Sequence, residues 1–402
     1  MEFPNSDFFE FISQNRETDP NILRLSSRKN PSAFDIDAAI TQIECRKKFA
    51  TKLNNFIIHR EFLFPDSLSG EQASHQAIAL YHSTNIDKAE KILDMTAGLG
   101  IDAVTFALRN KIVTALEINP SKASFLKLNA KTLKVPKLDV LNVEAIEYLK
   151  KTPEKFNLIF IDPSRRDNNL KRVYNLKDCS PNVILHQDLL LEKADIVLIK
   201  ASPLLDITQT IKDFKDITSI KAIGVKGECK EILIELSRNP EIEVQLAAIN
   251  LNNNGDIISE FIMPVDRIGS TSNDNIQFVE ESELKDGIYI LEPSAMLMKL
   301  APWSIICSRF KAKKLGKSSH IFISNELPEN FPGRVTSFDK IIKKQDWKSL
   351  SGFPASVISR NHPMSAEDIR KKLKLKEGDN NFIYASRIGD KPILLLSSFQ
   401  KR

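Results

Sequence analysis

Acidic residues that follow short apolar segments are the side chains best suited to chemistry in this sequence. Four of them lie between residues 91 and 166: Asp94, Glu117, Glu144 and Asp162. A carboxylate accepts hydrogen bonds from ammonium, hydroxyl and amino groups. If the apolar segments are parallel strands, their carboxyl ends meet at one edge of the sheet, where ligands of open α/β sheets bind. The spacing therefore predicts a single acid-lined site.

The first acid, Asp94, leads into a turn that contains Gly98 and Gly100 and then into a helical pattern. Glycine lets a ligand approach the backbone where a Cβ atom would collide with it, and the start of a helix offers free N–H groups. The spacing Gly98-x-Gly100-x-x-Ala103 also fits the loose dinucleotide-binding fingerprint, so an NAD-type oxidoreductase is an alternative. Asp94 favours another ligand, because a carboxylate there can bind the ammonium of a methionine moiety. An anionic pyrophosphate would gain nothing from it.

The next two acids fit the remaining parts of a nucleoside-containing cofactor. Glu117 lies about 20 residues after the glycine turn, the distance at which a strand-end acid accepts hydrogen bonds from ribose hydroxyls. Glu144 follows a third apolar segment and can accept a hydrogen bond from an adenine amine, although a helix-capping glutamate is the alternative. Thr96 and Asp102 either add polar contacts to the same ligand or cap the helix. The predicted cofactor-binding residues are Asp94, Thr96, Gly98, Gly100, Asp102, Glu117 and Glu144.

The fourth acid begins the motif Asp162-Pro163-Ser164, which we predict to be catalytic. The Asp162 carboxylate and the Pro163 carbonyl can both accept hydrogen bonds from a target amine. Such bonds would direct the nitrogen lone pair toward a methyl donor. Proline fixes its own φ and has no N–H group to compete. A purely structural Asp-Pro turn is the alternative.

A basic loop with one aromatic residue follows this motif. We expect substrate to bind there through Arg165, Arg166, Lys171, Arg172 and Tyr174. Arginine side chains contact the phosphates of a nucleic-acid strand with paired hydrogen bonds. Tyr174 or the Arg165 guanidinium could stack on a base. The alternative is a solvated loop whose charge is incidental.

Taken together, these motifs resemble those of class I S-adenosylmethionine-dependent methyltransferases over residues 88–250. Most of the chain more narrowly resembles a bacterial family with a THUMP-like C-terminal domain. That closer resemblance rests on residues 94–100, 162–166, 178–181, 292–295 and 373–396. It implies S-adenosyl-L-methionine as the cofactor. Because THUMP domains occur in RNA-modifying enzymes, it also implies an RNA substrate.

One position departs from the methyltransferases that act on amino groups. Those enzymes usually follow their Asp/Asn-Pro pair with proline and an aromatic residue that stacks on the base, whereas this chain has Ser164 and Arg165. We predict methylation of a base nitrogen in tRNA or rRNA. A small-molecule or protein amine, or a non-catalytic RNA-binding role, are the alternatives. Carbon methylation through a Cys179 thiolate is not expected, because no companion base is readable beside it.

The order of the apolar segments predicts an α/β fold class with a Rossmann-like domain. Short apolar strands alternate with helical stretches, which indicates a parallel sheet covered on both faces. The expected strands are 92–94, 112–117, 138–143, 158–161, 196–199, 217–225, 231–236 and 241–251, of which we expect the last two to pair with each other as an antiparallel extension. Upstream, the apolar period predicts helices over 35–56, capped by Ser32 or Asp35, and over 70–82.

Four regions are expected along the chain. They are a helical N-terminal domain (1–85), a class I methyltransferase domain (86–260), a small ferredoxin-like insert and linker (261–333) and a THUMP-like basic domain (334–402). The last two follow from the resemblance. The pattern also predicts a β-helix-helix-β unit over 287–323, a linker at 330–333 and a basic helix that starts near Ser365.

Charge is unevenly distributed along the 402 residues. Residues 301–402 contain 20 Lys and Arg against 9 Asp and Glu, which leaves 37 against 43 in the first 300 residues. A basic region of this kind favours a polyanionic partner such as RNA. The four cysteines show no metal-ligand spacing, and neither a signal peptide nor a membrane segment is apparent. We therefore expect a cytoplasmic protein with no metal or membrane partner. The sequence does not indicate an oligomeric state.

Overall fold

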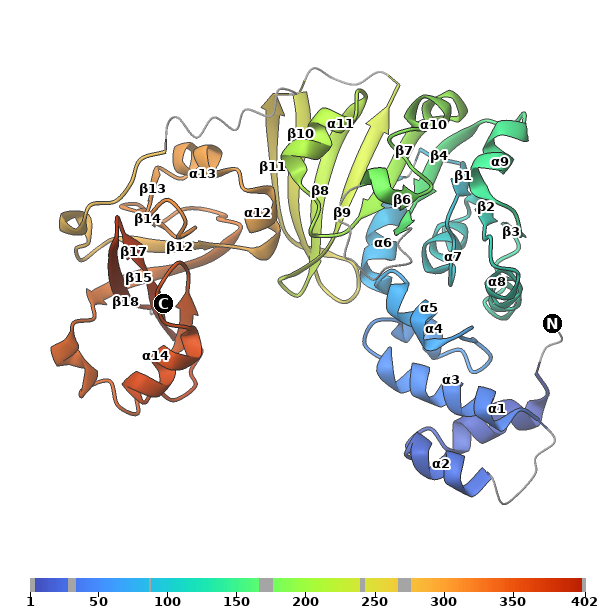
Figure 1. Cartoon of the computed structure of the whole chain (residues 1–402), viewed down its shortest axis with the longest axis horizontal. Helices are drawn as coiled ribbons and strands as arrows, with labels where there is room; N and C mark the ends of the chain where they lie inside the picture. The colour runs from blue at the N-terminus through green and yellow to red at the C-terminus, as the bar shows by residue number, and fades with distance from the viewer. Residues whose placement is uncertain are drawn as a thin grey trace. The chain divides into compact units, whose positions relative to one another are not determined.

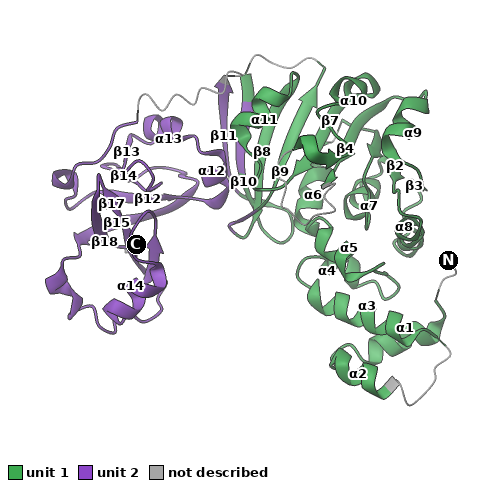
Figure 2. Cartoon of the chain, in the orientation of Figure 1, with its two compact units in different colours: residues 1–226, 230–244, 249–258 green, residues 227–229, 245–248, 259–402 purple. Residues whose placement is uncertain are grey.

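The computed structural model describes residues 4–27, 34–86, 88–165, 176–238, 243–266 and 276–399. The chain forms two compact units (Figure 2). The first contains residues 1–226, 230–244 and 249–258, and the second contains residues 227–229, 245–248 and 259–402. None of the helices in the described parts of the chain has the length and apolar character needed to span a bilayer.

The first unit begins with short helices (Figure 1). They are α1 (Ser6–Gln14), α2 (Pro20–Ser27), α3 (Ile36–Lys48), α4 (Asn54–Ile57), α5 (Ser67–Gln72) and α6 (Gln76–Thr84). The Asp35 carboxylate caps α3 by accepting a hydrogen bond from the Ala38 N–H group, which confirms that expected helix start. Both expected helices are interrupted. The first divides into α3 and α4, and the second into α5 and α6, because the His75 side chain caps a new helix by accepting from the Ala77 N–H group.

A nine-stranded sheet follows the helices. Its strands are β1 (Lys91–Asp94), β2 (Ile112–Leu116), β3 (Leu138–Leu141), β4 (Phe156–Ile161), β7 (Ala194–Ala201), β8 (Ile217–Val225), β9 (Glu228–Ser237), β10 (Glu243–Leu251) and β11 (Ile257–Asp266). Their order is β11-β10-β8-β9-β7-β4-β1-β2-β3. Strands β3, β2, β1, β4 and β7 are parallel neighbours, whereas β9 is antiparallel to β7. The predicted α/β fold is therefore confirmed.

Helices alternate with these strands along the chain. They are α7 (Ile101–Leu108), α8 (Pro120–Thr132), α9 (Ala145–Lys151), α10 (Gln187–Lys193) and α11 (Ile207–Asp213). Two short strands, β5 (Ser164–Arg165) and β6 (Cys179–Ser180), pair antiparallel after β4. They hold the residues that follow Asp162 against a later part of the chain.

The expected pairing of segments 231–236 and 241–251 is wrong. They form β9 and β10, but β8 lies between them in the sheet. Seven of the nine residues of β8 are buried, so this strand gains most when it has a neighbour on each side. A hairpin of β9 and β10 would leave it closer to an edge.

Strand register brings the predicted site residues to one edge of the sheet. Asp94, at the end of β1, lies opposite Ala115 of β2 and Phe160 of β4. Ile161 of β4 lies opposite Ile199 of β7. The residues that come next on these two strands, Asp162 and Lys200, are therefore neighbours.

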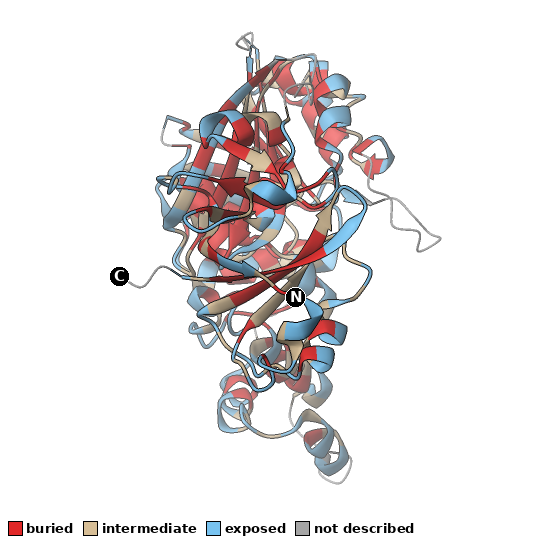
Figure 3. Cartoon of the chain, turned by 90° about the vertical axis from the view of Figure 1, so that its left-hand side faces the viewer, coloured by how far each residue is buried: buried red, intermediate tan, exposed pale blue. Residues whose placement is uncertain are grey.

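The second unit contains a seven-stranded sheet. Its strands are β12 (Tyr289–Pro293), β13 (Ala312–Lys314), β14 (Phe322–Ser324), β15 (Gly333–Ile341), β16 (Ser356–Ser359), β17 (Asn381–Ile388) and β18 (Lys391–Ser398), in the order β13-β14-β12-β15-β18-β17-β16. Its helices are α12 (Ala295–Leu300), α13 (Trp303–Arg309) and α14 (Ala366–Leu373). The buried residues, red in Figure 3, run along the strands and the inner faces of the helices.

Two local expectations for this unit are confirmed and one is wrong. The β-helix-helix-β unit is present as β12, α12, α13 and the strands that follow. Ser365 begins α14 with a reciprocal cap that involves Asp368. The expected linker at 330–333 is instead packed structure. Phe331 is buried against Phe310, and Gly333 starts β15, which pairs with β12.

Candidate active site

A cavity of about 780 Å³ opens at the carboxyl ends of the parallel strands. Every residue predicted to bind cofactor or to act in catalysis lines it: Asp94, Thr96, Gly98, Gly100, Asp102, Glu117, Glu144, Asp162, Pro163 and Ser164. Of the predicted substrate-binding residues, Arg165 contributes backbone to β5. The other four, Arg166, Lys171, Arg172 and Tyr174, lie outside the described residues.

Gly98 and Gly100 of the turn have different surroundings. Both have positive φ, +55° at Gly98 and +86° at Gly100. A Cβ atom on Gly100 would lie 2.1 Å from the Leu126 side chain of α8, so packing excludes a side chain there. A Cβ atom on Gly98 would meet nothing closer than the Thr96 carbonyl at 4.0 Å. Gly98 is thus the glycine beside open space for a ligand.

Glu117, just after β2, is held in place by backbone N–H groups. Its Oε2 accepts a hydrogen bond from Gly98 N at 3.0 Å, and its Oε1 accepts one from Asn119 N at 2.7 Å. The Asn142 side chain, after β3, donates to the carbonyls of Glu117 and Ile118. These bonds fix the carboxylate at the cavity wall and leave each oxygen further lone pairs for ligand hydroxyls. The sequence did not single out Asn119 or Asn142.

Two exposed apolar residues stand next to the acids on this wall. Ile118 is 68% exposed and Val143 is 37% exposed, and both line the cavity. They offer an apolar surface to a planar ring. Ile118 was missed, although an apolar residue directly after a strand-end acid was the available signal. The Glu144 carboxylate accepts from Glu147 N at 2.8 Å and so caps α9, as the alternative interpretation expected.

Asp94 is almost fully buried. Its Oδ1 accepts a hydrogen bond from Thr96 N at 3.0 Å. Burial raises the pKa of this carboxyl well above its usual value, and the charges of Asp102, Asp162 and Glu117 raise it further. A ligand cation near Asp94 would offset both effects.

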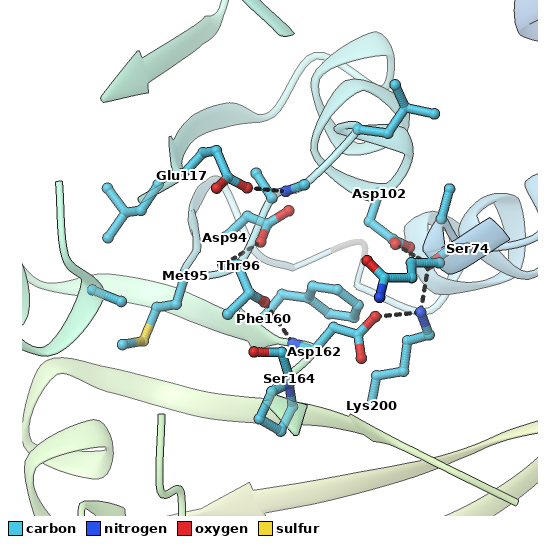
Figure 4. Close-up of a pocket in the computed structure, with 18 of the residues that line it drawn as sticks. Ser74, Asp94, Met95, Thr96, Asp102, Glu117, Phe160, Asp162, Ser164 and Lys200 are labelled. Atoms are coloured by element: carbon cyan, nitrogen blue, oxygen red, sulfur yellow. Dashed lines mark hydrogen bonds and ion pairs between the residues drawn. The ribbon is translucent and has the colours of Figure 1, made fainter. Parts of the chain in front are cut away.

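Thr96 connects the ends of the two central strands. Its hydroxyl oxygen accepts a hydrogen bond from Asp162 N at 2.7 Å. This bond ties the turn after β1 to the residue that follows β4 (Figure 4). Thr96 therefore positions the backbone of Asp162.

Asp102, at the start of α7, belongs to a buried network. Its Oδ2 accepts a hydrogen bond from the Ser74 hydroxyl, and its Oδ1 lies 2.9 Å from Nδ1 of His82. The other ring nitrogen of His82 lies 2.7 Å from Glu231 Oε1 on β9. Burial alone would lower the pKa of His82, but Glu231 and Asp102 outweigh it and raise the pKa to about 9. The imidazolium in turn lowers the pKa of Asp102 against the opposing effect of burial.

Lys200, at the end of β7, faces the predicted catalytic residue (Figure 4). Its Nζ donates to Asp162 Oδ2 at 2.5 Å and to the Ser74 hydroxyl oxygen at 3.0 Å. Burial would lower the pKa of Lys200, but the carboxylates of Asp162, Glu231 and Asp102 raise it above its usual value. The lysine is therefore charged at neutral pH. Lys200 was not among the residues predicted from the sequence, although its position at the end of an apolar segment was an available signal.

Three segments of the chain match known protein families. Residues 78–224 match the family described as Conserved hypothetical protein 95, residues 289–332 match a ferredoxin-like domain, and residues 335–398 match a THUMP-like domain. A crystal structure from Porphyromonas gingivalis W83, of a protein assigned as a methyltransferase, is similar over 100% of both chains, with 25% sequence identity and a TM-score of 0.83. These matches confirm the predicted fold and the predicted resemblance to methyltransferases with a THUMP-like C-terminal domain.

An uncharacterized RNA methyltransferase of Mycoplasma mobile is a more partial relative. It is 25% identical over 148 residues, which are 36% of this chain. The chain spans 40% of the length of that relative.

Proposed function

We propose that this chain is an S-adenosylmethionine-dependent methyltransferase that acts on structured RNA. The observation that carries the proposal is the buried Asp94 carboxyl, which lies among Asp102, Asp162 and Glu117. Buried carboxylates are costly unless a cation or donors accompany them. A ligand with an ammonium and a sulfonium group relieves that cost, whereas the pyrophosphate of NAD would add negative charge to it.

The lining residues fit each part of this cofactor. The Asp94 carboxylate would accept hydrogen bonds from the ammonium of the methionine part, Glu117 from the ribose hydroxyls and Glu144 from the adenine amine. Ile118 and Val143 would flank the adenine ring. The open side of Gly98 leaves room for the ligand beside the backbone. When bound, the cofactor supplies an electrophilic methyl group. The chain's own residues bind it, exclude water and orient the acceptor.

Three observations support RNA as the substrate. The last 102 residues carry the surplus of basic side chains, and residues 335–398 match a THUMP-like domain. The relative from Mycoplasma mobile is described as an RNA methyltransferase. If RNA binds through its phosphates, its affinity for the protein should fall steeply with salt. The expected decrease is about 10³-fold or more between 50 and 200 mM salt for six or more phosphate contacts.

Calorimetry and methyl transfer test this proposal together. We expect S-adenosylmethionine and S-adenosylhomocysteine to bind and NAD not to bind. RNA from cells that lack the gene should accept labelled methyl groups in vitro. Asp162→Ala should abolish transfer while cofactor affinity stays within a few-fold, since Asp162 would contact the acceptor. NAD binding without a response to either sulfur compound would instead favour an oxidoreductase. Unchanged activity in the variant would remove Asp162 from the site.

The atom that accepts the methyl group depends on the contacts of Asp162. A base nitrogen, the acceptor expected from the sequence, would be held by the Asp162 carboxylate and the Pro163 carbonyl. One oxygen of that carboxylate already accepts a hydrogen bond from Lys200. The contacts of Asp162 therefore bear directly on which atom receives the methyl group.

A further inference from the structure

We propose that the acceptor is a ribose 2′-hydroxyl of RNA, held between Asp162 and Lys200, and not a base nitrogen. This inference rests on the proposed function and names the atom on which it acts. It depends on the geometry of the two side chains, on the sign of the charge that each acceptor develops, and on the residues that surround them.

Asp162 and Lys200 form one polar unit at the cavity wall. Strand register makes them neighbours at the ends of β4 and β7. The Asp162 side chain is 38% exposed and that of Lys200 is 13% exposed, so the carboxylate faces the cavity while the ammonium supports it from the side of the protein. Among the described residues, only Oδ2 of this carboxylate has a hydrogen-bond donor, which is Lys200. Its Oδ1 is therefore available to accept from a substrate hydroxyl.

The charge of Lys200 disfavours nitrogen as the acceptor. An amine that attacks a methyl group becomes positively charged, and a neighbouring ammonium opposes that change. A ring nitrogen would accept a hydrogen bond from Lys200 with the lone pair that it needs for attack. A hydroxyl behaves in the opposite way, because its oxygen gains negative charge as the proton leaves. A fixed ammonium stabilises that charge.

Phe160 is not available to stack on a flipped base. Among the described lining residues the only aromatic one is Phe160. It is fully buried, and its ring contacts His82 and Phe106 in the core.

Further lysines gather around the same wall. Lys230 lines the cavity. The pKa of Lys52 is lowered to about 8, mainly by burial and further by the nearby charges of Lys200 and Lys230. Its Nζ donates to the carbonyls of Gly70 and Glu71 at 3.0 and 2.7 Å. A 2′-hydroxyl lies beside the phosphate of its own nucleotide, which lysine side chains at this wall can contact.

In the proposed step, the 2′-oxygen would form a bond to the methyl carbon as the carbon–sulfur bond breaks, and the sulfur would leave as a neutral thioether. The hydroxyl proton passes to Asp162 Oδ1 during bond formation and then to solvent. Lys200 keeps its proton throughout and stabilises the oxygen. Ser74 holds the Lys200 ammonium by accepting one of its hydrogens.

The product identifies the acceptor directly. RNA from cells that lack the gene is methylated in vitro by the full chain with labelled S-adenosylmethionine and then digested with alkali. Alkaline cleavage needs a free 2′-hydroxyl, so label on a 2′-oxygen appears in an alkali-resistant dinucleotide. Label on a base appears in a mononucleotide. The dinucleotide is the result that we expect. A labelled mononucleotide would overturn this inference and leave the proposed function intact, whereas RNA that accepts no label would overturn both.

Variants test the assigned roles. Lys200→Ala should lower kcat by about 10²–10³-fold with little change in KM for the cofactor, as for loss of one charged donor to a developing oxyanion. Lys200→Arg should recover part of that loss, because it restores a cation. Lys151→Ala, which changes an exposed lysine of α9, is the matched control. If the Lys200→Ala variant melts at the temperature of the parent and has the same kcat as the control variant, the proposed role of Lys200 is wrong.

Binding without cofactor gives a second readout. An oligonucleotide that spans the labelled site is compared with its analogue carrying a 2′-deoxynucleotide at the acceptor. The parent should bind the ribose form roughly 2- to 12-fold more tightly, as for one hydrogen bond. Lys200→Ala and Asp162→Asn should both reduce that preference. Equal affinity of the parent for the two oligonucleotides would count against a held hydroxyl.

Discussion

Replacement of Asp94 by asparagine should raise the stability of the protein and weaken its cofactor binding. The two effects have one cause. Burial and the neighbouring acids raise the pKa of Asp94 in the folded protein. A carboxyl whose folded pKa exceeds its unfolded value destabilises the fold once the pH rises above the unfolded value, by up to about 1.4 kcal/mol per unit of difference. Asp94→Asn removes that penalty.

The stability effect has a defined pH window. At pH 7 the cofactor-free variant should melt at a higher temperature than the parent. Below about pH 4 the carboxyl is protonated in both the folded and the unfolded chain, and the difference should vanish. Asparagine retains an oxygen that can accept from Thr96 N, so the turn loses no hydrogen bond. Thermal melts from about pH 3 to 8 measure this, with Asp139→Asn, at an exposed position, as control.

The binding effect has the opposite sign. A charge-assisted hydrogen bond contributes about 1.5–3 kcal/mol, so Asp94→Asn should weaken S-adenosylmethionine binding roughly 10- to 150-fold. The ammonium requires an ionised Asp94, so the parent's affinity should fall by up to about tenfold per pH unit below the pKa of the free protein. The variant should lack that slope. Calorimetry from pH 5 to 7 tests both points. A variant that binds as tightly as the parent, with the same pH slope, would refute the assignment of Asp94 to the ammonium.

Four further substitutions separate structural from functional residues. His82→Ala removes the imidazolium that lies between the buried carboxylates of Asp102 and Glu231, and it should cost about 3–5 kcal/mol of unfolding free energy. Because the folded pKa of His82 is raised to about 9, its contribution is complete below the unfolded value and is lost as the pH rises through 9, which thermal melts of parent and variant would reveal. Gly100→Ala should lower the melting temperature because of its packing, whereas Gly98→Ala should mainly weaken cofactor binding in calorimetry. Cys179→Ser should keep methyl transfer to RNA, and its loss in a folded variant would revive the thiolate mechanism.

The sequence predicted the part of the site that depends on local spacing. An acid at the end of each apolar strand, with glycines after the first, specifies both the strands and the edge at which they meet. Asp94, Glu117, Glu144 and Asp162 were therefore predicted together, and all line the cavity. The order of β8, β9 and β10 was not predictable in the same way, because any of these buried strands could take the central place.

Residues that act through long-range contacts escaped the sequence analysis. His82 and Glu231 are 149 residues apart, and each resembles an ordinary polar residue within its own helix or strand. Lys200 and Asp162 are 38 residues apart and meet only because β4 and β7 are adjacent. Hydrophobic periodicity and motif spacing describe local sequence only, so they cannot predict contacts between residues that are far apart in the chain. The close packing of Gly100 was likewise not predictable, because the Leu126 side chain that a Cβ atom would meet lies on the next helix.

The helices before β1 contain no recognisable motif, yet they determine the charge at the reaction site. Ser74 donates to Asp102 and accepts from Lys200, so it joins the buried network to the proposed acceptor pair. His82, protonated between Asp102 and Glu231, balances part of their negative charge. Without that balance, both carboxylates would compete with Asp162 for the ammonium of Lys200, because all three act on it electrostatically. The N-terminal helices therefore allow Lys200 to remain with Asp162, where a reacting oxygen would need it.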